Sequence, residues 1–216
     1  KKTIEGPRDY YSSDLENFIS YIVGMDTSHE LIISDEEYVL FTDKLAYSVA
    51  KFKGMKDGKP SGTGTDVFSY VKSSDGWKLS ALHNTVVTND DKNDYSKAYP
   101  LKVDIMSLPG RLSSAIKNKD KTAIIGLFHS PLAPYVNLDY GNHFTYFNNS
   151  VAGMATRTTR ARYQLDYSYN NIKLEVYDQY IAVLTMDYLV KINGEQRAVG
   201  KQMWTLYPTA KDDWRI

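Results

Sequence analysis

Hydrophobic and polar residues alternate over many short stretches of the chain, which is the pattern of half-buried β-strands. In the first half, the alternation predicts strands at residues 30–33, 38–41, 45–52, 65–71 and 77–87. In the second half, it predicts strands at residues 134–138, 162–169, 173–176, 180–191, 197–207 and from 214 onward. Apolar residues at helical spacing predict helices at residues 13–23, 107–117, 122–128 and 148–159. Helices followed by a long antiparallel meander indicate an α+β fold.

The second half of the chain repeats the order of strands and turns of the first. Asp57-Gly58 and Asn193-Gly194 each follow a strand rich in β-branched and aromatic residues. Both pairs favour a type I′ hairpin turn, whose two central residues need positive φ. An aromatic residue, Phe68 or Trp204, lies ten positions after each turn glycine, and each half then reaches a Trp followed by a basic and an aliphatic residue. We infer an internal duplication.

Composition and charge exclude several classes of function. The 26 basic and 26 acidic side chains give no net charge, which argues against a general nucleic-acid binder. The chain has no cysteine, so thiolate metal sites and cysteine nucleophiles are ruled out. Its four histidines include no pair at ligand spacing on one helix. No apolar run reaches the roughly 20 residues that span a bilayer. We therefore expect no metal, no cofactor, no nucleic-acid partner and no membrane span.

These features resemble the nuclear transport factor 2-like superfamily, specifically its SnoaL-like and ketosteroid-isomerase-like branch. The resemblance is carried by residues 57–58, 62–72, 75–79 and 82–85, and again by residues 193–194, 200, 204 and 213–216. It implies two cone-shaped units in tandem, each a curved antiparallel sheet with N-terminal helices packed on its concave face. Against the family pattern, the first unit lacks its opening helix and strand, and the second ends early. The missing parts are either trimmed or supplied by the other copy or a second chain.

The middle and the start of the chain bear on its organisation. Residues 88–97 are polar and charged, which is typical of a linker. We place the first unit with its linker at residues 1–97 and the second unit at residues 98–216. The chain begins Lys1-Lys2-Thr3 without a methionine, which fits a processed N-terminus. This favours an extracytoplasmic location, although no signal sequence is visible and the compartment stays open.

The resemblance implies a cavity with a carboxylate base, and two aspartates are candidates for it. Asp139 ends a short predicted strand, roughly where the family places its base; the alternative is an ordinary aspartate in a turn. Asp187 interrupts a strand that is otherwise nearly all apolar. If Asp187 faces a cavity, desolvation should raise its pKa; if it faces outward, it is a solvated or ion-paired strand residue. The helix at 107–117 lacks the family's tyrosine, which counts against isomerase chemistry.

Further polar and aromatic residues are candidates for ligand contacts. Arg162 closes a local basic cluster that suits an anionic ligand, with a solvated helix end as the alternative. The full set of candidate ligand-binding residues is Tyr47, Tyr135, His83, His143, Tyr146, Arg162 and Trp204. For the histidines, the alternative is an ordinary loop or strand residue. The three tryptophans are expected to pack in the core.

Three functions fit these expectations. The first is binding of a small apolar or anionic metabolite in a cavity of the cone. The second is a cofactor-free isomerase or lyase of the SnoaL-like type with Asp139 or Asp187 as general base. The third is a structural or interaction module, with the two copies forming a pseudo-dimer within the chain, or a homodimer of chains.

Overall fold

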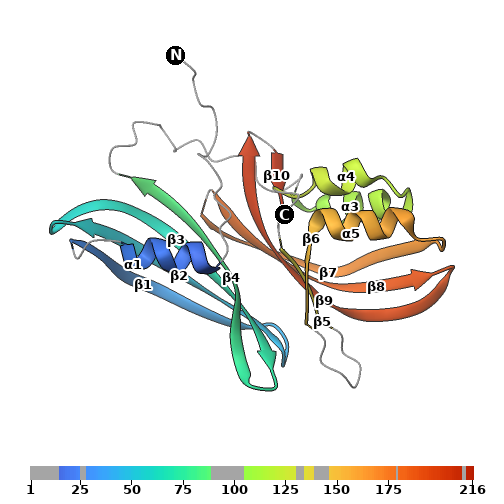
Figure 1. Ribbon diagram of the computed structural model, residues 1–216, viewed down its shortest axis with the longest axis horizontal. Helices are drawn as coiled ribbons and strands as arrows, with labels where there is room; N and C mark the ends of the chain where they lie inside the picture. The colour runs from blue at the N-terminus through green and yellow to red at the C-terminus, as the bar shows by residue number, and fades with distance from the viewer. Residues whose placement is uncertain are drawn as a thin grey trace, which may run out of the picture. The chain divides into compact units, whose positions relative to one another are not determined.

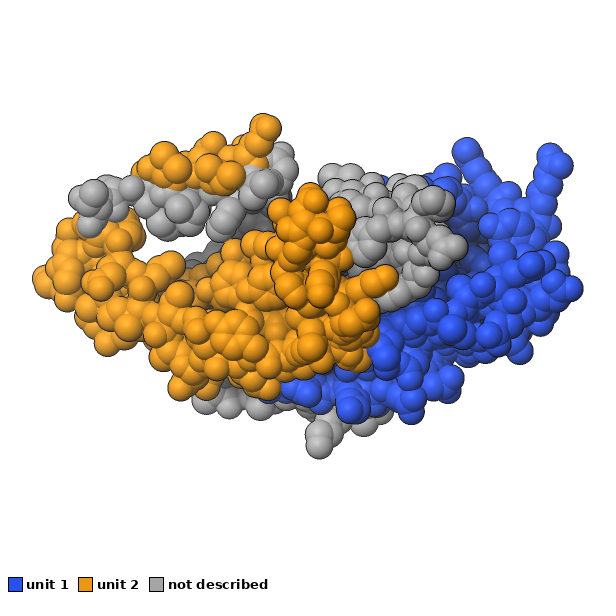
Figure 2. Space-filling model, turned by 90° about the horizontal axis from the view of Figure 1, so that it is seen from below, with its two compact units in different colours: residues 1–8, 99–176, 182–216 blue, residues 9–98, 177–181 orange. Residues whose placement is uncertain are grey.

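The computed structural model describes residues 15–24, 28–88, 105–129, 134–138, 146–178, 180–210 and 213–216. Most of these residues lie in antiparallel strands, and two four-stranded sheets dominate the fold (Figure 1). Within those ranges, no helix is long and apolar enough to cross a membrane. The chain divides into two compact units, coloured separately in Figure 2. We call them the N-terminal unit, residues 9–98 with 177–181, and the C-terminal unit, residues 99–176 and 182–216 with 1–8.

The N-terminal unit is built on a sheet whose strands pair in the order β1-β2-β3-β4. The strands are β1 (His29–Leu40), β2 (Leu45–Lys56), β3 (Lys59–Ser73) and β4 (Gly76–Thr88). One described helix, α1 (Leu15–Gly24), precedes them. Its apolar residues Ile19 and Val23 are exposed, so this side of α1 does not contribute to a core.

The C-terminal unit contains a second sheet with the strand order β10-β9-β8-β7 and a two-stranded sheet of β5 and β6. Three short helices lie over one face of the larger sheet (Figure 1). The helices are α3 (Leu108–Lys117), α4 (Lys121–Gly126) and α5 (Val151–Arg160). The strands are β5 (Pro134–Leu138), β6 (Tyr146–Ser150), β7 (Leu165–Asp178), β8 (Ile181–Ile192), β9 (Glu195–Ala210) and β10 (Asp213–Arg215).

The prediction of two cone-shaped α+β units with N-terminal helices is wrong. The chain is mainly antiparallel β, with two four-stranded sheets and a few short helices. One reason is that the strands are longer than predicted. Residues 30–33 and 38–41 form one strand, β1, because Asp35 and Glu36 are accommodated as a bulge between Ser34 and Glu37. Polar residues that suggest a loop in the sequence therefore lie inside a strand.

Both predicted hairpin turns are confirmed. Asp57 and Gly58 have φ values of 51° and 72°, and Asn193 and Gly194 have 50° and 87°. The positive values at both central positions are those that a type I′ turn requires. The predicted boundary between residues 97 and 98 lies outside the described residues and stays a prediction.

The two hairpins share one register. Adding 136 to the residue numbers of the β2–β3 pairs gives the β8–β9 pairs: Phe52↔Gly64 becomes Tyr188↔Gly200. The bulge on the third strand recurs at the same distance from the turn, at Ser61 and Arg197. Since register and bulge position are set locally in each hairpin, the shared pattern supports the inferred duplication.

The same offset of 136 residues relates two glycines that each lie beneath an aromatic ring. A methyl group on Gly64 would lie 2.5 Å from the ring of Phe52, and one on Gly200 would lie 2.7 Å from the ring of Tyr188. In each sheet, therefore, an aromatic side chain covers a cross-strand glycine that leaves room for it. The first strands also correspond: Asp35 and Asn171 have φ values of 50° and 52° within β1 and β7.

Candidate functional site

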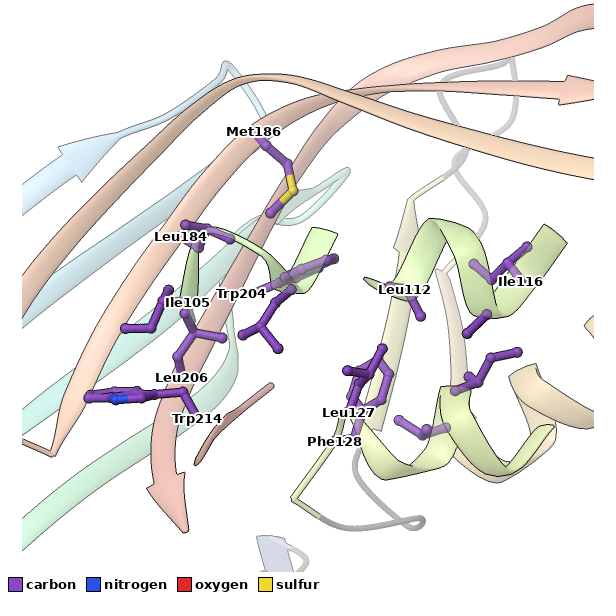
Figure 3. Close-up of a cluster of buried hydrophobic side chains, with 14 of the residues drawn as sticks. Ile105, Leu112, Ile116, Leu127, Phe128, Leu184, Met186, Trp204, Leu206 and Trp214 are labelled. Atoms are coloured by element: carbon purple, nitrogen blue, oxygen red, sulfur yellow. The ribbon is translucent and has the colours of Figure 1, made fainter. Parts of the chain in front are cut away.

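One face of the C-terminal sheet is covered by helices and forms a dry core. Alternate residues of β8 and β9 point to this face, including Leu184, Met186, Trp204 and Leu206 (Figure 3). They pack with apolar residues of the helices and loops: Ile105, Leu108, Leu112, Ile116, Ile124 and Val151. Burial of this apolar surface is the main stabilising contribution in the unit. We call it the packed face.

The N-terminal sheet has an equivalent face, which we call the open face. Strand register and alternation place on it Ile33, Tyr38, Leu40, Ala46, Ser48, Ala50, Phe52, Asp66, Phe68, Tyr70, Trp77, Leu79, Leu82, Asn84 and Val86. The edge residues remain exposed, among them Leu40 at 69% and Leu79 at 52%. The central Ser48, Ala50 and Phe52 are buried. The face thus combines a partly enclosed centre with exposed apolar flanks.

The equivalent tryptophans of the two last strands show how differently the faces are used. Trp77 pairs with Lys72 in β3, and Trp214 pairs with Pro208 in β9, at corresponding positions. Trp214 is 1% exposed and belongs to the core, whereas Trp77 is 40% exposed beneath the ammonium group of Lys72. The expectation that all three tryptophans pack in the core is wrong for Trp77, whose ring is exposed on its sheet face.

Side-chain chemistry differs between the two faces where the backbone register is the same. Leu184 of the packed face corresponds to Ser48 of the open face, and Met186 corresponds to Ala50. In β9 and β3, Leu206 and Gln202 correspond to Tyr70 and Asp66, respectively. At the centre of the open face, two large apolar residues are therefore replaced by small ones, and the two further positions hold a tyrosine and an acid. This pattern is typical of a binding surface, in which a few polar groups lie among apolar ones.

Asp66 is the most unusual group of the open face. It lies in the middle of β3, between Ala50 of β2 and Asn84 of β4. It is half-buried, and burial raises the pKa of Asp66 to about 6. Among the described residues, none donates a hydrogen bond or provides an ion pair to its carboxylate. A carboxylate in this setting favours a ligand that supplies positive charge or a proton.

Hydroxyl groups and aromatic rings flank Asp66 on the same face. The hydroxyls of Ser48 and Tyr70 are hydrogen-bonded at 3.0 Å. The rings of Phe68 and Tyr70 are stacked, with centroids 6.5 Å apart. On the neighbouring strand, Tyr38 donates a 2.8 Å hydrogen bond to Glu36, and this bond raises the pKa of the Tyr38 hydroxyl. The face can therefore supply donors, acceptors and aromatic surface to one ligand.

Asp187 lies on the sheet face opposite to the packed face, because its neighbours Met186 and Tyr188 have the other orientation. Its carboxylate accepts 2.6 Å hydrogen bonds from Lys201 and Asn171. The bond from Lys201, followed by that from Asn171, lowers the pKa of Asp187. This shift is opposite to that expected of a desolvated base, and the contacts agree with the alternative interpretation, an ion-paired strand residue.

The other described candidate residues do not form one site. Trp204 is part of the core of the packed face, where its ring meets that of Tyr169 edge-on. Tyr47 and His83 lie on the face of the N-terminal sheet opposite to Asp66. There Tyr47 is buried and accepts a 3.1 Å hydrogen bond from the hydroxyl of Tyr177. Arg162 follows α5 and is exposed.

The remaining candidates are Asp139, His143, Tyr135 and Tyr146. Asp139 and His143 lie outside the described residues. Tyr135 lies in β5 and Tyr146 in β6, and their strand positions are Tyr135↔Asn149 and Leu138↔Tyr146. Their roles in binding or catalysis stay predictions.

Sequence reasoning missed Asp66. The residue sits in a regular alternation of polar and apolar residues, Thr65-Asp66-Val67-Phe68, which suggests a solvated strand residue. The useful signal is its spacing: Asp66, Phe68 and Tyr70 share one face because strand residues two apart point the same way. An acid in register with two aromatic residues differs from an acid on a wholly polar face.

Within the described ranges, no group of three or more acidic or histidine side chains is arranged to hold a metal ion. Because a half-buried acid, hydroxyl groups and aromatic rings share the open face, we take this face, with Asp66 at its centre, as the candidate site. Comparison of the chain with protein-family models, curated proteins and solved structures found no match. The resemblance to the nuclear transport factor 2-like superfamily accordingly stays a prediction.

Proposed function

We propose that the protein binds a small molecule on the open face of its N-terminal sheet. The observation that carries the proposal is the pair of equivalent sheet faces: one is packed by helices, and the other has exposed apolar edges around a half-buried carboxylate that has no partner among the described residues. Exposed apolar surface of this kind commonly marks a binding site. The ligand would cover it and would meet Asp66 at the centre.

The central side chains favour a small ligand over a docked helix. On the packed face, the positions beneath the helices are Leu184, Met186 and Leu206. Of the corresponding open-face residues, Ser48 and Ala50 are much smaller, and the hydroxyls of Ser48 and Tyr70 are hydrogen-bonded to each other. A docked apolar helix would desolvate the Asp66 carboxylate, which costs free energy unless the carboxylate gains a partner. A small ligand with its own polar groups meets that requirement.

A titration with 2-phenylethanol, a neutral aromatic probe, tests the proposal. In ¹H–¹⁵N NMR spectra of the whole chain, we expect saturable shifts at residues 46–52 and 64–70. Ser48→Leu introduces the side chain of the packed face and should weaken binding about tenfold or more by filling the centre. Val199→Leu, an exposed position of the C-terminal sheet, should leave binding unchanged.

The outcomes of this titration are distinct. Shifts confined to the open face and weakened by Ser48→Leu support the proposal. The absence of shifts at millimolar probe, or shifts confined to the C-terminal unit, would contradict it. Circular dichroism and the amide exchange of β2 and β3 verify that Ser48→Leu still folds. Phe68→Ala, which removes one ring of the stacked pair, provides a second variant with the same expected loss.

A second candidate function rests on the pKa of about 6 at Asp66. A carboxylate titrating near neutrality is suited to general base catalysis, as in the cofactor-free isomerase alternative. The hydroxyls of Ser48 and Tyr70 on the same face would act as donors to a developing oxyanion. Deuterium incorporation from D₂O at the acidic carbon of a cyclic 1,3-diketone tests this function. Incorporation above the buffer rate that is lost in Asp66→Asn supports it, and an unchanged rate contradicts it.

A further inference from the structure

We propose that the ligand of the open face is an organic cation, an amine carried on an apolar or aromatic body. The inference rests on the proposed binding function and adds the chemical class of the ligand. It replaces the expectation of an anionic metabolite, which came from the arginines near residue 160. Those arginines lie in the C-terminal unit and are not part of the open face.

The charges of the open face support a cation. Asp66 lies at the centre, and Glu36 lies on the same face beside Tyr38. The lysines with the same orientation occur at strand ends: Lys56, its partner Lys59, and Lys72. Among the described residues, the middle of the face therefore carries negative charge without a nearby basic side chain. An ammonium group bound there would supply the missing counter-charge at a site that water only partly solvates.

The neighbouring lysines of β2 point away from Asp66. Lys51 and Lys53 alternate with the open-face residues Ala50 and Phe52, so their side chains leave from the other face. Lys51 forms an ion pair with Asp35 at 3.9 Å. The equivalent of Lys51 in the second sheet is Asp187, which has its own partner Lys201. Lys51 and Asp187 thus each have an oppositely charged partner on the sheet face that points away from the open face or the packed face, respectively. The Asp66 carboxylate has no partner among the described residues.

The aromatic residues around Asp66 add a second attraction for a cation. Phe68 and Tyr70 follow Asp66 along β3 and lie on the same sheet face. Phe52 of β2 also lies on this face, opposite Gly64, which precedes Asp66 in β3. The faces of aromatic rings attract ammonium groups, and the contribution grows when the site is partly desolvated. The pair of a carboxylate and several rings recognises an amine more specifically than either group alone.

The second sheet offers an internal comparison for the charge. Gln202 occupies the position of Asp66, so the acid is particular to the N-terminal sheet. Gln202 has the same orientation but lies on the packed face, where burial of a carboxylate would cost free energy. The ionisable group occurs on the face that remains accessible.

Three probes of one size test the inference: 2-phenylethylammonium, 2-phenylethanol and phenylacetate. Each is titrated into the whole chain near pH 7.5 and followed by NMR shifts of residues 46–52 and 64–70. We expect the ammonium probe to bind about tenfold more tightly than the alcohol, and phenylacetate to bind most weakly. Asp66→Asn should remove the preference for the ammonium probe, while Asp187→Asn, the matched change in the other sheet, should keep it.

The result separates this inference from the proposed function. Equal affinities for the ammonium and the alcohol, or a preference that survives Asp66→Asn, would overturn the cation inference and leave the binding function in place. No binding of any probe to the open face would contradict both. Lowering the pH through about 6 should weaken ammonium binding to the wild type, because Asp66 is then neutralised. The other titratable groups facing it, Glu36, Tyr38 and Tyr70, are checked by repeating the titration with Asp66→Asn.

Discussion

The two sheets share a register but use the same face for different purposes. In the C-terminal sheet, Leu184, Met186 and Leu206 complete a core beneath three helices. In the N-terminal sheet, the matching positions hold Ser48, Ala50 and Tyr70 on a face whose edges are exposed. A few side chains are enough to separate a packed, stabilising face from the face that we propose to bind a ligand, because the backbone pairing is the same in both. The predictions below test this difference, beginning with the largest expected effect.

The equivalent tryptophans should contribute very unequally to stability. Trp214→Ala removes a ring that is 1% exposed and should cost about 3–5 kcal/mol of unfolding free energy in the C-terminal unit. Trp77→Ala removes a ring that is 40% exposed and should cost about 1 kcal/mol in the N-terminal unit. Native-state hydrogen exchange, followed strand by strand, measures both effects separately. Similar losses for the two variants would mean that the two faces are equally packed.

The two glycines under aromatic rings should also differ. A methyl group on Gly64 would lie 1.8 Å from the backbone oxygen of Thr85, which cannot move independently of β4. Gly64→Ala should therefore cost about 2–3 kcal/mol. The three atoms nearest to a methyl group on Gly200 all belong to the side chain of half-buried Tyr188, which can rotate away, so Gly200→Ala should cost about 1 kcal/mol. Urea unfolding compares them, and a larger loss for Gly200→Ala would contradict the close strand packing at Gly64.

Replacing Asp66 should stabilise the protein at neutral pH. Folding raises the pKa of Asp66 from 3.8 to about 6, so the wild type loses stability as the pH rises between these values. Asp66→Asn should be about 1–2 kcal/mol more stable than the wild type near pH 7.5, allowing for partial solvent screening. The difference should vanish below about pH 4. Thermal unfolding across this pH range measures it, and a destabilised Asp66→Asn at neutral pH would indicate a hidden partner for the carboxylate.

Replacing Asp187 should have the smallest effect and the opposite sign. Hydrogen bonds from Lys201 and Asn171 lower the pKa of Asp187, so its ionised form stabilises the folded state above the unfolded pKa. That contribution is lost as the pH falls through the folded pKa. Because the pair is exposed, Asp187→Asn should lose about 0.5 kcal/mol or less near pH 7.5. A clear gain in stability would contradict the ion-paired assignment, and the pH series used for Asp66→Asn detects it.

Local features of the fold could be predicted from the sequence, whereas its layers could not. The turns at Asp57-Gly58 and Asn193-Gly194 follow from the backbone freedom of those residues, and both are confirmed. The helices at α3, α4 and α5 are close to their predicted ranges because apolar spacing is a local signal. Whether helices cover a given sheet is not local. The assumption that both copies share one architecture led to the wrong fold.

The acid at the centre of the proposed site was overlooked for a related reason. Asp187 attracted attention because it interrupts an apolar run, but its partner Lys201 is paired across the hairpin and Asn171 comes from another strand. Asp66 looked ordinary because its strand alternates regularly. Its unusual environment arises from burial between neighbouring strands and from the lack of a partner among the described residues, and both depend on the assembled sheet.

The most direct test of the proposed role of the open face is a measurement of the pKa of Asp66 with and without a cationic probe. Carboxyl ¹³C NMR of aspartate-labelled protein gives the titration of Asp66, assigned by Asp66→Asn. We predict a pKa of about 6 in the free protein and a lower pKa in the presence of saturating 2-phenylethylammonium, since the bound cation favours the ionised acid. A pKa near 3.8 that does not respond to the probe would contradict both the burial of Asp66 and the binding of a cation beside it.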